Sequence, residues 1–345
     1  MSLKRRTVLK AVVAAPGAMF AGMPSVVLGN APVRWRVQTL WGAGEETFKF
    51  FQEFCDNVKT ATSGRLEIQP FAAGAVVGAF ETLDAVGNNV LQGQSTYPGY
   101  WAGKEPALAV IGDFAFGYTA PEQQERWLYE KGGIEMLRQS YQRFNVHTVG
   151  ATWWGMESIT SRKPIRRPED FAGVKHRGAQ GIAAETIAKM GASIVVIPGG
   201  EAYSALEKGV VDSVDWSTLS VNAKVGFFEV AKYATYPGFH SMPIQDFTVN
   251  AGAWKALPDD VKQIVERTWR EFSRTQVTRI AANDQRVATE VRAKGVELVA
   301  WSNADLARAR QLAQGVVDQW SAKSALAKQA AESQRAFLRE LKLLA

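Results

Sequence analysis

The sequence has few of the residues that most often carry metal and redox chemistry. Cys55 is the single cysteine among 345 residues, and the three histidines, His147, His176 and His240, stand far apart. One thiol excludes an intrachain disulfide and a CxxC metal or redox site. The histidines are too scattered for a metal triad at helical spacing, although the loop around His240 suits a ligand site.

Motifs of cofactor-dependent and covalent catalysis are also missing. The sequence contains no HExxH, no GxxxxGK[ST], no GxSxG and no complete GxGxxG. Residues 41–44, WGAG, approach the last of these, but Thr47 stands where the third glycine belongs, so we interpret them as a turn before a helix. The pair of carboxylates used by glycosidases has no fixed sequence motif, so it cannot be recognised in this way, and nothing in the sequence indicates one particular pair. The sequence gives no positive indication of an enzyme.

Excess charge of one sign is confined to the N-terminus. Forty Lys and Arg residues against 34 Asp and Glu residues give a net charge of +6. Lys4, Arg5, Arg6 and Lys10 are the only charged residues before Val33, which leaves +2 (6 minus 4) for the rest of the chain. Such a small charge is not the electrostatic footprint of a nucleic-acid-binding protein. We expect no nucleic-acid partner.

Residues 1–29 have the order of features of an export signal. The basic residues precede an uncharged run of small and apolar residues, and Val27 and Gly29 would occupy the −3 and −1 positions of a cleavage site. The adjacent Arg5 and Arg6 resemble a twin-arginine signal. We expect a signal peptide over 1–29 and a periplasmic protein exported by the twin-arginine route. The general secretion route and a retained membrane anchor are the alternatives.

Alternating strand and helix signals predict an α/β protein. Short apolar or alternating runs predict strands over residues 35–40, 65–69, 174–177, 193–197 and 213–216. Apolar residues at three- and four-residue spacing predict helices over 45–62, 79–87, 182–190 and 201–208, and from about 257 to the end. In the first helix, Phe48, Phe51, Cys55 and Val58 form the buried stripe, which makes Cys55 an inert core thiol. Two interleaved α/β units and a long C-terminal helix follow from this order.

Aromatic residues are abundant where turns are expected. Of eleven tryptophans, Trp41, Trp101 and the pair Trp153-Trp154 stand near glycines, and residues 97–101 contain three aromatic side chains in five positions. Small-ligand pockets commonly have aromatic walls and a few polar groups that fix orientation. This clustering favours a ligand pocket, and the alternative is that the rings fill the two cores.

Several motifs, taken in order, make residues 33–341 resemble the solute-binding proteins of TRAP transporters, in particular the subgroup for 2-oxo acids and related monocarboxylates. The most specific stretch is PGGEAYSAL at 198–206. The others are SGRL at 63–66, FAAG at 71–74, YWAGK at 100–104, GVVD at 209–212, DW at 215–216, YPGFH at 236–240, and Trp254 before Leu257-Pro258.

The resemblance implies a bilobal periplasmic-binding-protein fold whose two α/β lobes are joined by crossing strands and close over a ligand. It assigns residues 33–152 and about 241–285 to lobe I, 153–240 and about 286–302 to lobe II, and 303–345 to a long C-terminal helix. In the 2-oxo acid subgroup this helix packs across a twofold axis, which implies a homodimer. The alternative is a helix folded back on its own lobes.

The resemblance also implies the ligand site. Arg177 matches the arginine that grips the substrate carboxylate, and a guanidinium suits that role because its fork of N–H groups meets a carboxylate with two hydrogen bonds. The remaining substrate-binding residues that we expect are Trp216, Tyr100, Trp101, Trp154, Glu157, Phe116 and His240. No catalytic residue and no required cofactor are implied.

A metal ion beside the ligand is the second expectation from the subgroup. Its ligands there are an acidic residue, the backbone carbonyl of the following tryptophan, and a glutamine. Asp215 and Trp216 match the first two, whereas Glu157 stands near the place of the glutamine and would supply an oxygen to Na⁺ or Ca²⁺. Glu157 could equally meet an amine or hydroxyl of a different substrate.

The function implied is extracytoplasmic capture of a small organic anion and its delivery to TRAP membrane permease subunits, without chemistry. A 2-oxo or 2-hydroxy monocarboxylate is favoured, and an aromatic carboxylate or a sulfonate is the alternative ligand. An exported enzyme acting on a small carboxylate and a sensor that presents its ligand to a receptor are the alternative functions.

Overall fold

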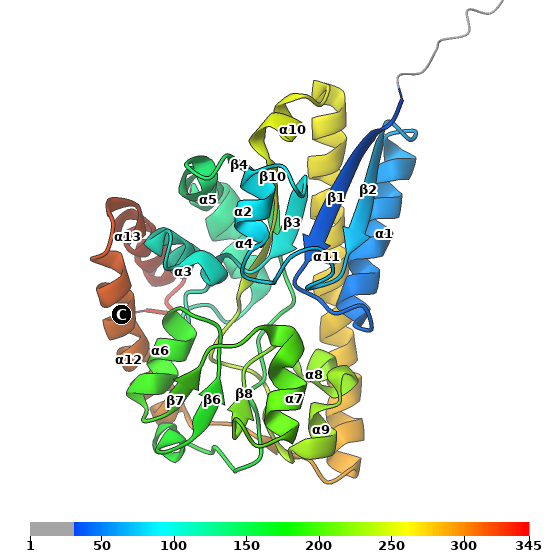
Figure 1. Ribbon diagram of the computed structural model, residues 1–345. Coiled ribbons are helices and arrows are strands. Elements are labelled where there is room, and N and C mark those ends of the chain that lie inside the picture. The colour runs from blue at the N-terminus through cyan, green and yellow to red at the C-terminus, as the bar shows by residue number, and fades with distance from the viewer. Residues whose placement is uncertain (1–30, 345) are drawn as a thin grey trace, which may run out of the picture. The chain divides into compact units, whose positions relative to one another are not determined.

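Two β-sheets and the helices around them form the described part of the chain, residues 31–344 of a computed structural model (Figure 1). The predicted signal peptide lies outside these residues. Residues Pro32–Ala345 form one compact unit. Within the described range, no helix combines the length and the apolar character needed to cross a membrane. The two sheets are the centres of two lobes, so the bilobal α/β fold that we predicted is confirmed.

The first sheet has the strand order β2-β1-β3-β10-β4. Its strands are β1 (Val33–Thr39), β2 (Leu66–Phe71), β3 (Gly93–Thr96), β4 (Val146–Trp153) and β10 (Ile244–Asn250). β1 runs parallel to β2 and β3, whereas β10 is antiparallel to both β3 and β4. The sequence signals indicated β1 and β2 but not β3, β4 and β10. All three missed strands are buried along nearly their whole length, so they lack the polar alternation of a half-exposed strand.

Helix α1 (Glu46–Ala61) follows the first strand and packs against β2. The predicted stripe is confirmed, since Phe48, Phe51, Cys55 and Val58 are all buried. The remaining helices near the first sheet are α2 (Thr82–Gly87), the 3₁₀ helix η1 (Pro98–Trp101), α3 (Pro106–Gly112), α4 (Pro121–Glu130), α5 (Gly133–Gln142) and α10 (Ala251–Lys255).

The second sheet has the strand order β11-β9-β5-β8-β6-β7. Its strands are β5 (Thr160–Ser161), β6 (Lys175–Arg177), β7 (Ser193–Val195), β8 (Ser213–Val214), β9 (Tyr233–Thr235) and β11 (Glu297–Val299). The helices and 3₁₀ helices of this region are η2 (Pro168–Phe171), α6 (Ile182–Lys189), η3 (Gly199–Glu201), α7 (Ala202–Glu207), α8 (Leu219–Val225) and α9 (Phe227–Val230). β6 is parallel to β7 and β8, as expected for strands joined through helices.

The longest helix, α11 (Asp259–Ala293), contacts both halves of the molecule. Its 35 residues give a length of about 50 Å. It packs against α1 and β4 of the first half and against α8 and β11 of the second, as its course in Figure 1 shows.

The single C-terminal helix predicted over 303–345 is wrong. The chain forms two helices, α12 (Asn303–Ser321) and α13 (Ala325–Glu340), which pack against each other. The hydroxyl of Ser324 accepts a hydrogen bond from the Ala327 N–H at 3.1 Å and so starts α13 as a new helix. α12 packs on α3 and α6, and α13 packs on α3.

The apolar face of this pair is buried inside the chain itself. Ala309, Ala313, Val316, Val317 and Trp320 are each at most 2% exposed. These residues of α12 are therefore packed against the chain's own lobes, while Leu312 on the same helix is 36% exposed.

Candidate functional site

A pocket of about 420 Å³ lies where residues from both sheets meet. Its lining comes from three places: the segments that follow β1, β3 and α3; the segments around β6 and β8; and the stretches of chain that join the two sheets. The lining residues are Leu40, Tyr97, Tyr100, Asp113, Trp154, Glu157, Arg177, Ala179, Gln180, Gly181, Ala183, Asp215, Trp216, Ser241 and Pro243.

Arg177 ends strand β6, and its side chain is buried in the pocket wall with 2% exposure. Nε and Nη2 donate to the carbonyl oxygen of Ile197 at 3.1 and 3.0 Å, and Nη1 donates to the carbonyl oxygen of Asp215. These bonds use three of the five guanidinium N–H groups and leave two for another partner. Among residues 31–344, no carboxylate lies within ion-pair distance of this guanidinium, so its charge is buried against neutral acceptors.

Tyr100 and Trp216 complete the surroundings of Arg177. The guanidinium carbon lies 5.4 Å from the centre of the Trp216 ring, within cation–π distance. Burial raises the pKa of the Tyr100 hydroxyl, and the neighbouring Arg177 partly opposes that increase. The phenol therefore stays protonated and adds a hydroxyl donor beside the guanidinium.

Two tryptophans, Trp154 and Trp216, line the pocket, and a third, Trp41, packs against both of them. The Trp41 ring meets Trp154 edge-on at 5.1 Å and Trp216 at 5.4 Å. Trp216 also packs over the backbone of Gly199, where a Cβ would overlap the indole ring. The glycine of the PGGEAYSAL motif is thus required by the close approach of a pocket side chain to the backbone.

Glu45 links the first half of the chain to these tryptophans. Its Oε1 accepts a hydrogen bond from the Gly42 N–H at 2.7 Å, so the predicted turn before α1 is confirmed. Burial raises the pKa of Glu45 to about 7, although its hydrogen bonds with Gly42 and the Trp216 side chain lower it in part.

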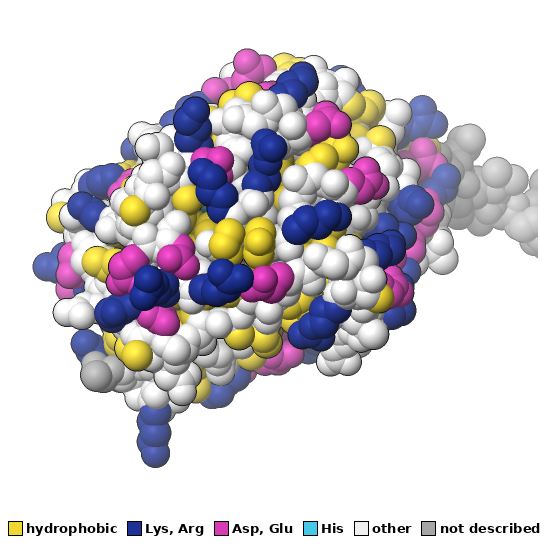
Figure 2. All heavy atoms as spheres, turned by 90° about the horizontal axis from the view of Figure 1, so that it is seen from below, with side chains coloured by type: hydrophobic (Ala, Val, Ile, Leu, Met, Phe, Trp, Pro, Cys, Tyr) yellow, Lys and Arg dark blue, Asp and Glu magenta, His cyan; other side chains and the backbone are white. Residues whose placement is uncertain are grey.

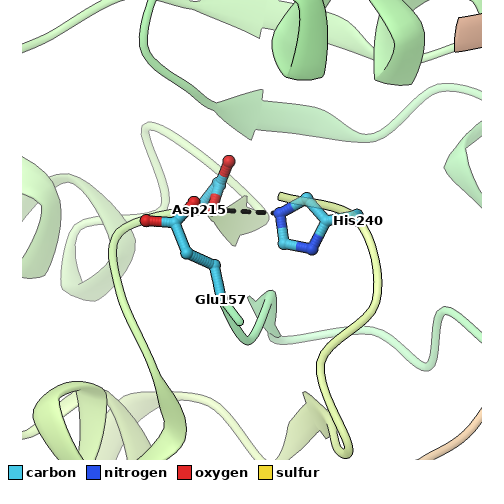
Figure 3. Close-up of side chains that lie close together, drawn as sticks. All are labelled: Glu157, Asp215 and His240. Atoms are coloured by element: carbon cyan, nitrogen blue, oxygen red, sulfur yellow. Dashed lines mark ion pairs between the residues drawn. The ribbon is translucent and has the colours of Figure 1, made fainter. Parts of the chain in front are cut away.

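Glu157, Asp215 and His240 converge from three separate segments of the chain (Figure 3). One donor atom from each lies within 4.8 Å of the other two, and all three residues are buried. Burial and the nearby Asp215 carboxylate raise the pKa of Glu157 well above its usual range. Burial opposes ionisation of Asp215, but His240 and the Glu157 carboxyl hold its pKa well below the usual value. Of the two acids, Glu157 keeps the proton and Asp215 carries the charge.

Hydrogen bonds in the cluster are incomplete. The Trp154 indole N–H donates to Glu157 Oε1 at 3.0 Å. Asp215 Oδ1 and both ring nitrogens of His240 have no hydrogen-bond partner within the described residues. Unpartnered buried polar atoms are costly and call for an occupant such as water, an ion or a ligand.

Six of the nine residues predicted for the site line the pocket: Arg177, Trp216, Tyr100, Trp154, Glu157 and Asp215. Trp101 and Phe116 instead lie in the hydrophobic core, 2% and 4% exposed. His240 is not part of the lining but lies against Asp215, with Nε2 and Oδ1 3.1 Å apart.

Asp113 is the clearest residue that the sequence analysis missed. It follows α3 and lines the pocket, where its carboxylate accepts hydrogen bonds from the Ser241 hydroxyl at 2.8 Å and the Met242 N–H at 3.3 Å. Burial raises its pKa to about 6. The available signal was its position as the only charged residue between Glu105 and Glu122. Tyr97 also lines the pocket and belongs to the aromatic cluster at 97–101 noted in the sequence, whereas Gln180 and Ser241 line it and carried no signal.

Comparison with known proteins identifies the family. The model of the bacterial extracellular solute-binding proteins, family 7 (DctP), matches residues 37–324. The chain is 31% identical to a monocarboxylate 2-oxoacid-binding periplasmic protein of Nostoc sp., an alignment that covers 98% of this chain and 95% of that protein.

Two solved structures extend the likeness to three dimensions. A TRAP transporter solute-binding protein from Bordetella bronchiseptica has a TM-score of 0.85 at 27% identity, covering 91% of this chain and 94% of that one. Its crystals hold a dimer with calcium and picolinate in one site and the other site empty. A TRAP periplasmic solute-binding protein from Rhodobacter sphaeroides in an open, ligand-free form has a TM-score of 0.73 at 29% identity, covering 90% and 99%. With the family model matched over most of its length, this chain belongs to the bacterial extracellular solute-binding proteins of family 7, the DctP family.

Proposed function

We propose that this chain is the periplasmic solute-binding protein of a TRAP transporter and that it captures a small 2-oxo or 2-hydroxy monocarboxylate. It would deliver this anion to the membrane permease without changing it chemically. The likeness to a 2-oxoacid-binding relative and to two TRAP solute-binding proteins supports this choice.

The observation that carries the proposal is the buried and uncompensated charge of Arg177. A buried ion is strongly unfavourable unless it is paired, and the described chain offers this guanidinium only carbonyl oxygens and a phenol. A carboxylate bound at the two remaining N–H groups supplies the missing charge. The Tyr100 hydroxyl would donate to the same anion.

The tryptophans of the pocket restrict what else the ligand carries. Trp154 and Trp216 both line the pocket, and their rings suit a compact apolar group beside the carboxylate. An aromatic carboxylate remains the alternative ligand, because the Bordetella bronchiseptica relative holds picolinate, and a sulfonate would meet the same guanidinium.

A cation beside the ligand is part of the proposal. Within the described residues, Asp215 Oδ1 is buried and makes no hydrogen bond, although His240 Nε2 lies 3.1 Å away. The Glu157 carboxyl is close by, so the residues fit a cation that prefers oxygen ligands. Asp215, Glu157 and the Trp216 backbone carbonyl would hold Na⁺ or Ca²⁺. When bound, the ion would offset the charge of the carboxylates and bridge to the oxygen atoms of the organic anion.

Capture requires the two lobes to close around the ligand. Arg177 and Asp215 belong to the second sheet and are buried by residues of the first half, such as Tyr97 and Tyr100, which indicates a closed arrangement. The lower TM-score with the open relative, despite its slightly higher identity, agrees with this. We assign residues 33–152 and about 241–285 to lobe I and 153–240 and about 286–302 to lobe II.

The export route and the oligomeric state are separate parts of the proposal. The pair Arg5-Arg6 supports the twin-arginine route, and its replacement by Lys-Lys should then stop the protein from reaching the periplasm. A homodimer has support in the dimeric Bordetella bronchiseptica relative, whereas most apolar residues of α12, with the exception of Leu312, are packed within the chain. Light scattering at micromolar concentration separates dimer from monomer.

The proposal is tested by calorimetry with pyruvate, lactate, picolinate and ethanesulfonate, using wild type and Arg177→Ala. Loss of a desolvated charge partner costs about 3–5 kcal/mol, so we expect affinity for the preferred anion to fall at least about 100-fold. Arg34→Ala, at a side chain 78% exposed on β1, is the matched control and should bind as wild type does. Binding by Arg177→Ala within about threefold of wild type would contradict the anion role. Turnover of the bound acid would instead identify an enzyme.

A further inference from the structure

Asp113 brings a third carboxyl group into the pocket, and neither the anion nor the cation of the proposed function uses it. The residue is 2% exposed, and its two carboxylate oxygens accept hydrogen bonds from the Ser241 hydroxyl at 2.8 Å and the Met242 N–H at 3.3 Å. Both donors are neutral, and within residues 31–344 this carboxylate forms no ion pair. A buried negative charge without a cationic partner is unfavourable, so its place in a ligand pocket points to a role toward the ligand.

The carboxyl group of Asp113 carries its charge at neutral pH. Burial raises its pKa to about 6, and the hydrogen bond from Ser241, the nearby His240 and the hydrogen bond from Met242 limit that increase. At pH 7.5 a group with this pKa has lost its proton almost completely. The charge also acts inside the pocket, because, after burial, the Asp113 carboxylate is the largest cause of the raised pKa of the Tyr97 hydroxyl.

The positive and the negative charge act at two neighbouring tyrosines. Burial raises the pKa of the Tyr100 hydroxyl and Arg177 partly opposes it, whereas Asp113 acts on Tyr97. The two tyrosine rings meet edge-on, with their centres 5.6 Å apart. Of the described residues that line the pocket, Arg177 is the one with a basic side chain. The ligand carboxylate therefore binds at the Arg177 end, and a second carboxylate on the ligand would lie nearer to Asp113.

The charges of the pocket leave no place for a second anionic group once the proposed ligand and cation have bound. The ligand carboxylate pairs with Arg177, and Na⁺ or Ca²⁺ offsets Asp215 while Glu157 keeps its proton. With Na⁺ the charge of Asp113 stays uncompensated, and with Ca²⁺ it is only just balanced. A second ligand carboxylate would thus meet like charge in a buried site, where solvent screens the repulsion little.

Selection of this kind belongs to the pocket rather than to the surface. On the face shown in Figure 2, Lys and Arg side chains are interspersed with Asp and Glu side chains, so this face does not sort anions by their charge. We propose that Asp113 is the residue that restricts the pocket to acids with a single negative charge and rejects dicarboxylates by like-charge repulsion. The inference rests on the proposed function, because it requires that an organic anion binds at Arg177.

The test compares acids of the same shape. In 2-hydroxy-4-methylpentanoate an isopropyl group replaces the second carboxylate of malate, and 2-hydroxy-3-methylbutanoate is related to tartronate in the same way. Calorimetry at pH 7.5 with Ca²⁺ present measures their binding to wild type, Asp113→Asn and Asp56→Asn. We expect wild type to prefer each monocarboxylate at least about tenfold and Asp113→Asn to lower both preferences at least about tenfold. Asp56, exposed on α1 and outside the pocket lining, is the matched control, and its variant should keep both preferences.

A purely structural role of Asp113 predicts a different result. Ser241→Ala removes one hydrogen bond of the Asp113 carboxylate and keeps its charge, so this variant should retain the preference for monocarboxylates. Loss of the preference in Ser241→Ala, its retention in folded Asp113→Asn, or equal binding of both acids of a pair by wild type overturns the proposal. The arms with wild type and Ser241→Ala decide the question even where Asp113→Asn does not fold. Equal binding of a pair leaves the proposed function intact, whereas the absence of binding of these acids, pyruvate and lactate by wild type contradicts both.

Discussion

The carboxyl group of Glu45 should make the stability of the protein depend on pH. Its pKa lies near 7 in the folded chain, against the usual 4.5, because the group is buried between the start of α1 and the Trp216 ring. Below pH 4.5 the group is protonated in both the folded and the unfolded state, so it adds no pH dependence. Between pH 4.5 and 7 the unfolded chain releases the proton and the folded chain keeps it. Folding stability is therefore lost as the pH rises through this window.

The size of this effect follows from the two pKa values. A rise in the pKa of Glu45 from 4.5 to about 7 corresponds to about 3 kcal/mol, because each pKa unit is worth about 1.4 kcal/mol. Partial exposure of the residue reduces the expected effect to about 1–3 kcal/mol. Glu45→Gln removes the titrating proton and keeps an oxygen that can accept the Gly42 N–H. The free energy of unfolding of the variant, measured relative to that of wild type, should therefore increase by about 1–3 kcal/mol as the pH rises from 5 to 8.

Urea denaturation of both proteins at pH 5, 6, 7 and 8 measures this difference directly. Glu81 provides a matched control, because it accepts the Gly78 N–H at 3.2 Å with the same three-residue spacing but is exposed. Glu81→Gln should show no trend with pH. If the difference between Glu45→Gln and wild type stays constant from pH 5 to pH 8, the burial of a protonated Glu45 is refuted.

Two further predictions concern the walls of the pocket. Gly199→Ala should displace the Trp216 ring and weaken anion binding, measured by calorimetry, at least about tenfold. The control is Gly200→Ala, where a Cβ meets nothing within 4 Å, and it should bind as wild type does. Equal affinities of the two variants would contradict the close packing of Trp216 on Gly199. Asp113→Ala should lower the free energy of unfolding by about 2–3 kcal/mol, because the buried Ser241 hydroxyl and a main-chain N–H lose their acceptor. A loss below about 0.5 kcal/mol in urea denaturation would show that water replaces the carboxylate without cost.

Local periodicity predicted those elements whose stability depends on one exposed and one buried face. The stripe of α1 and the alternation of β2, in which Leu66 and Ile68 are buried, are of this kind. β4 and β10 escaped detection because they are buried on both faces, and the break at Ser324 escaped because a serine cap, without Pro or Gly, is a weak signal. At these positions the secondary structure is determined by tertiary packing, which the local sequence pattern does not reveal.

The residues of the pocket likewise divide into those that the sequence predicted and those that it did not. Arg177 and Asp215 were expected from the family resemblance, and the structure places both in the lining of the pocket. Trp101 and Phe116 could not be separated from pocket residues by sequence, since an aromatic ring suits a core and a ligand wall equally well. Asp113 required knowledge of which loops meet in space.

The order of strands in the first sheet has a consequence for how the chain is made. β10 lies between β3 and β4, so the sheet stays in two pieces until residues 244–250 have emerged from the ribosome. By then, five of the six strands of the second sheet have already been synthesised, and the sixth, β11, follows at 297–299. Neither half can therefore complete itself early, and neither can be produced as a continuous gene fragment. A nascent chain of this topology exposes unpaired strand edges for most of its synthesis, which makes protection from aggregation a requirement of its biogenesis.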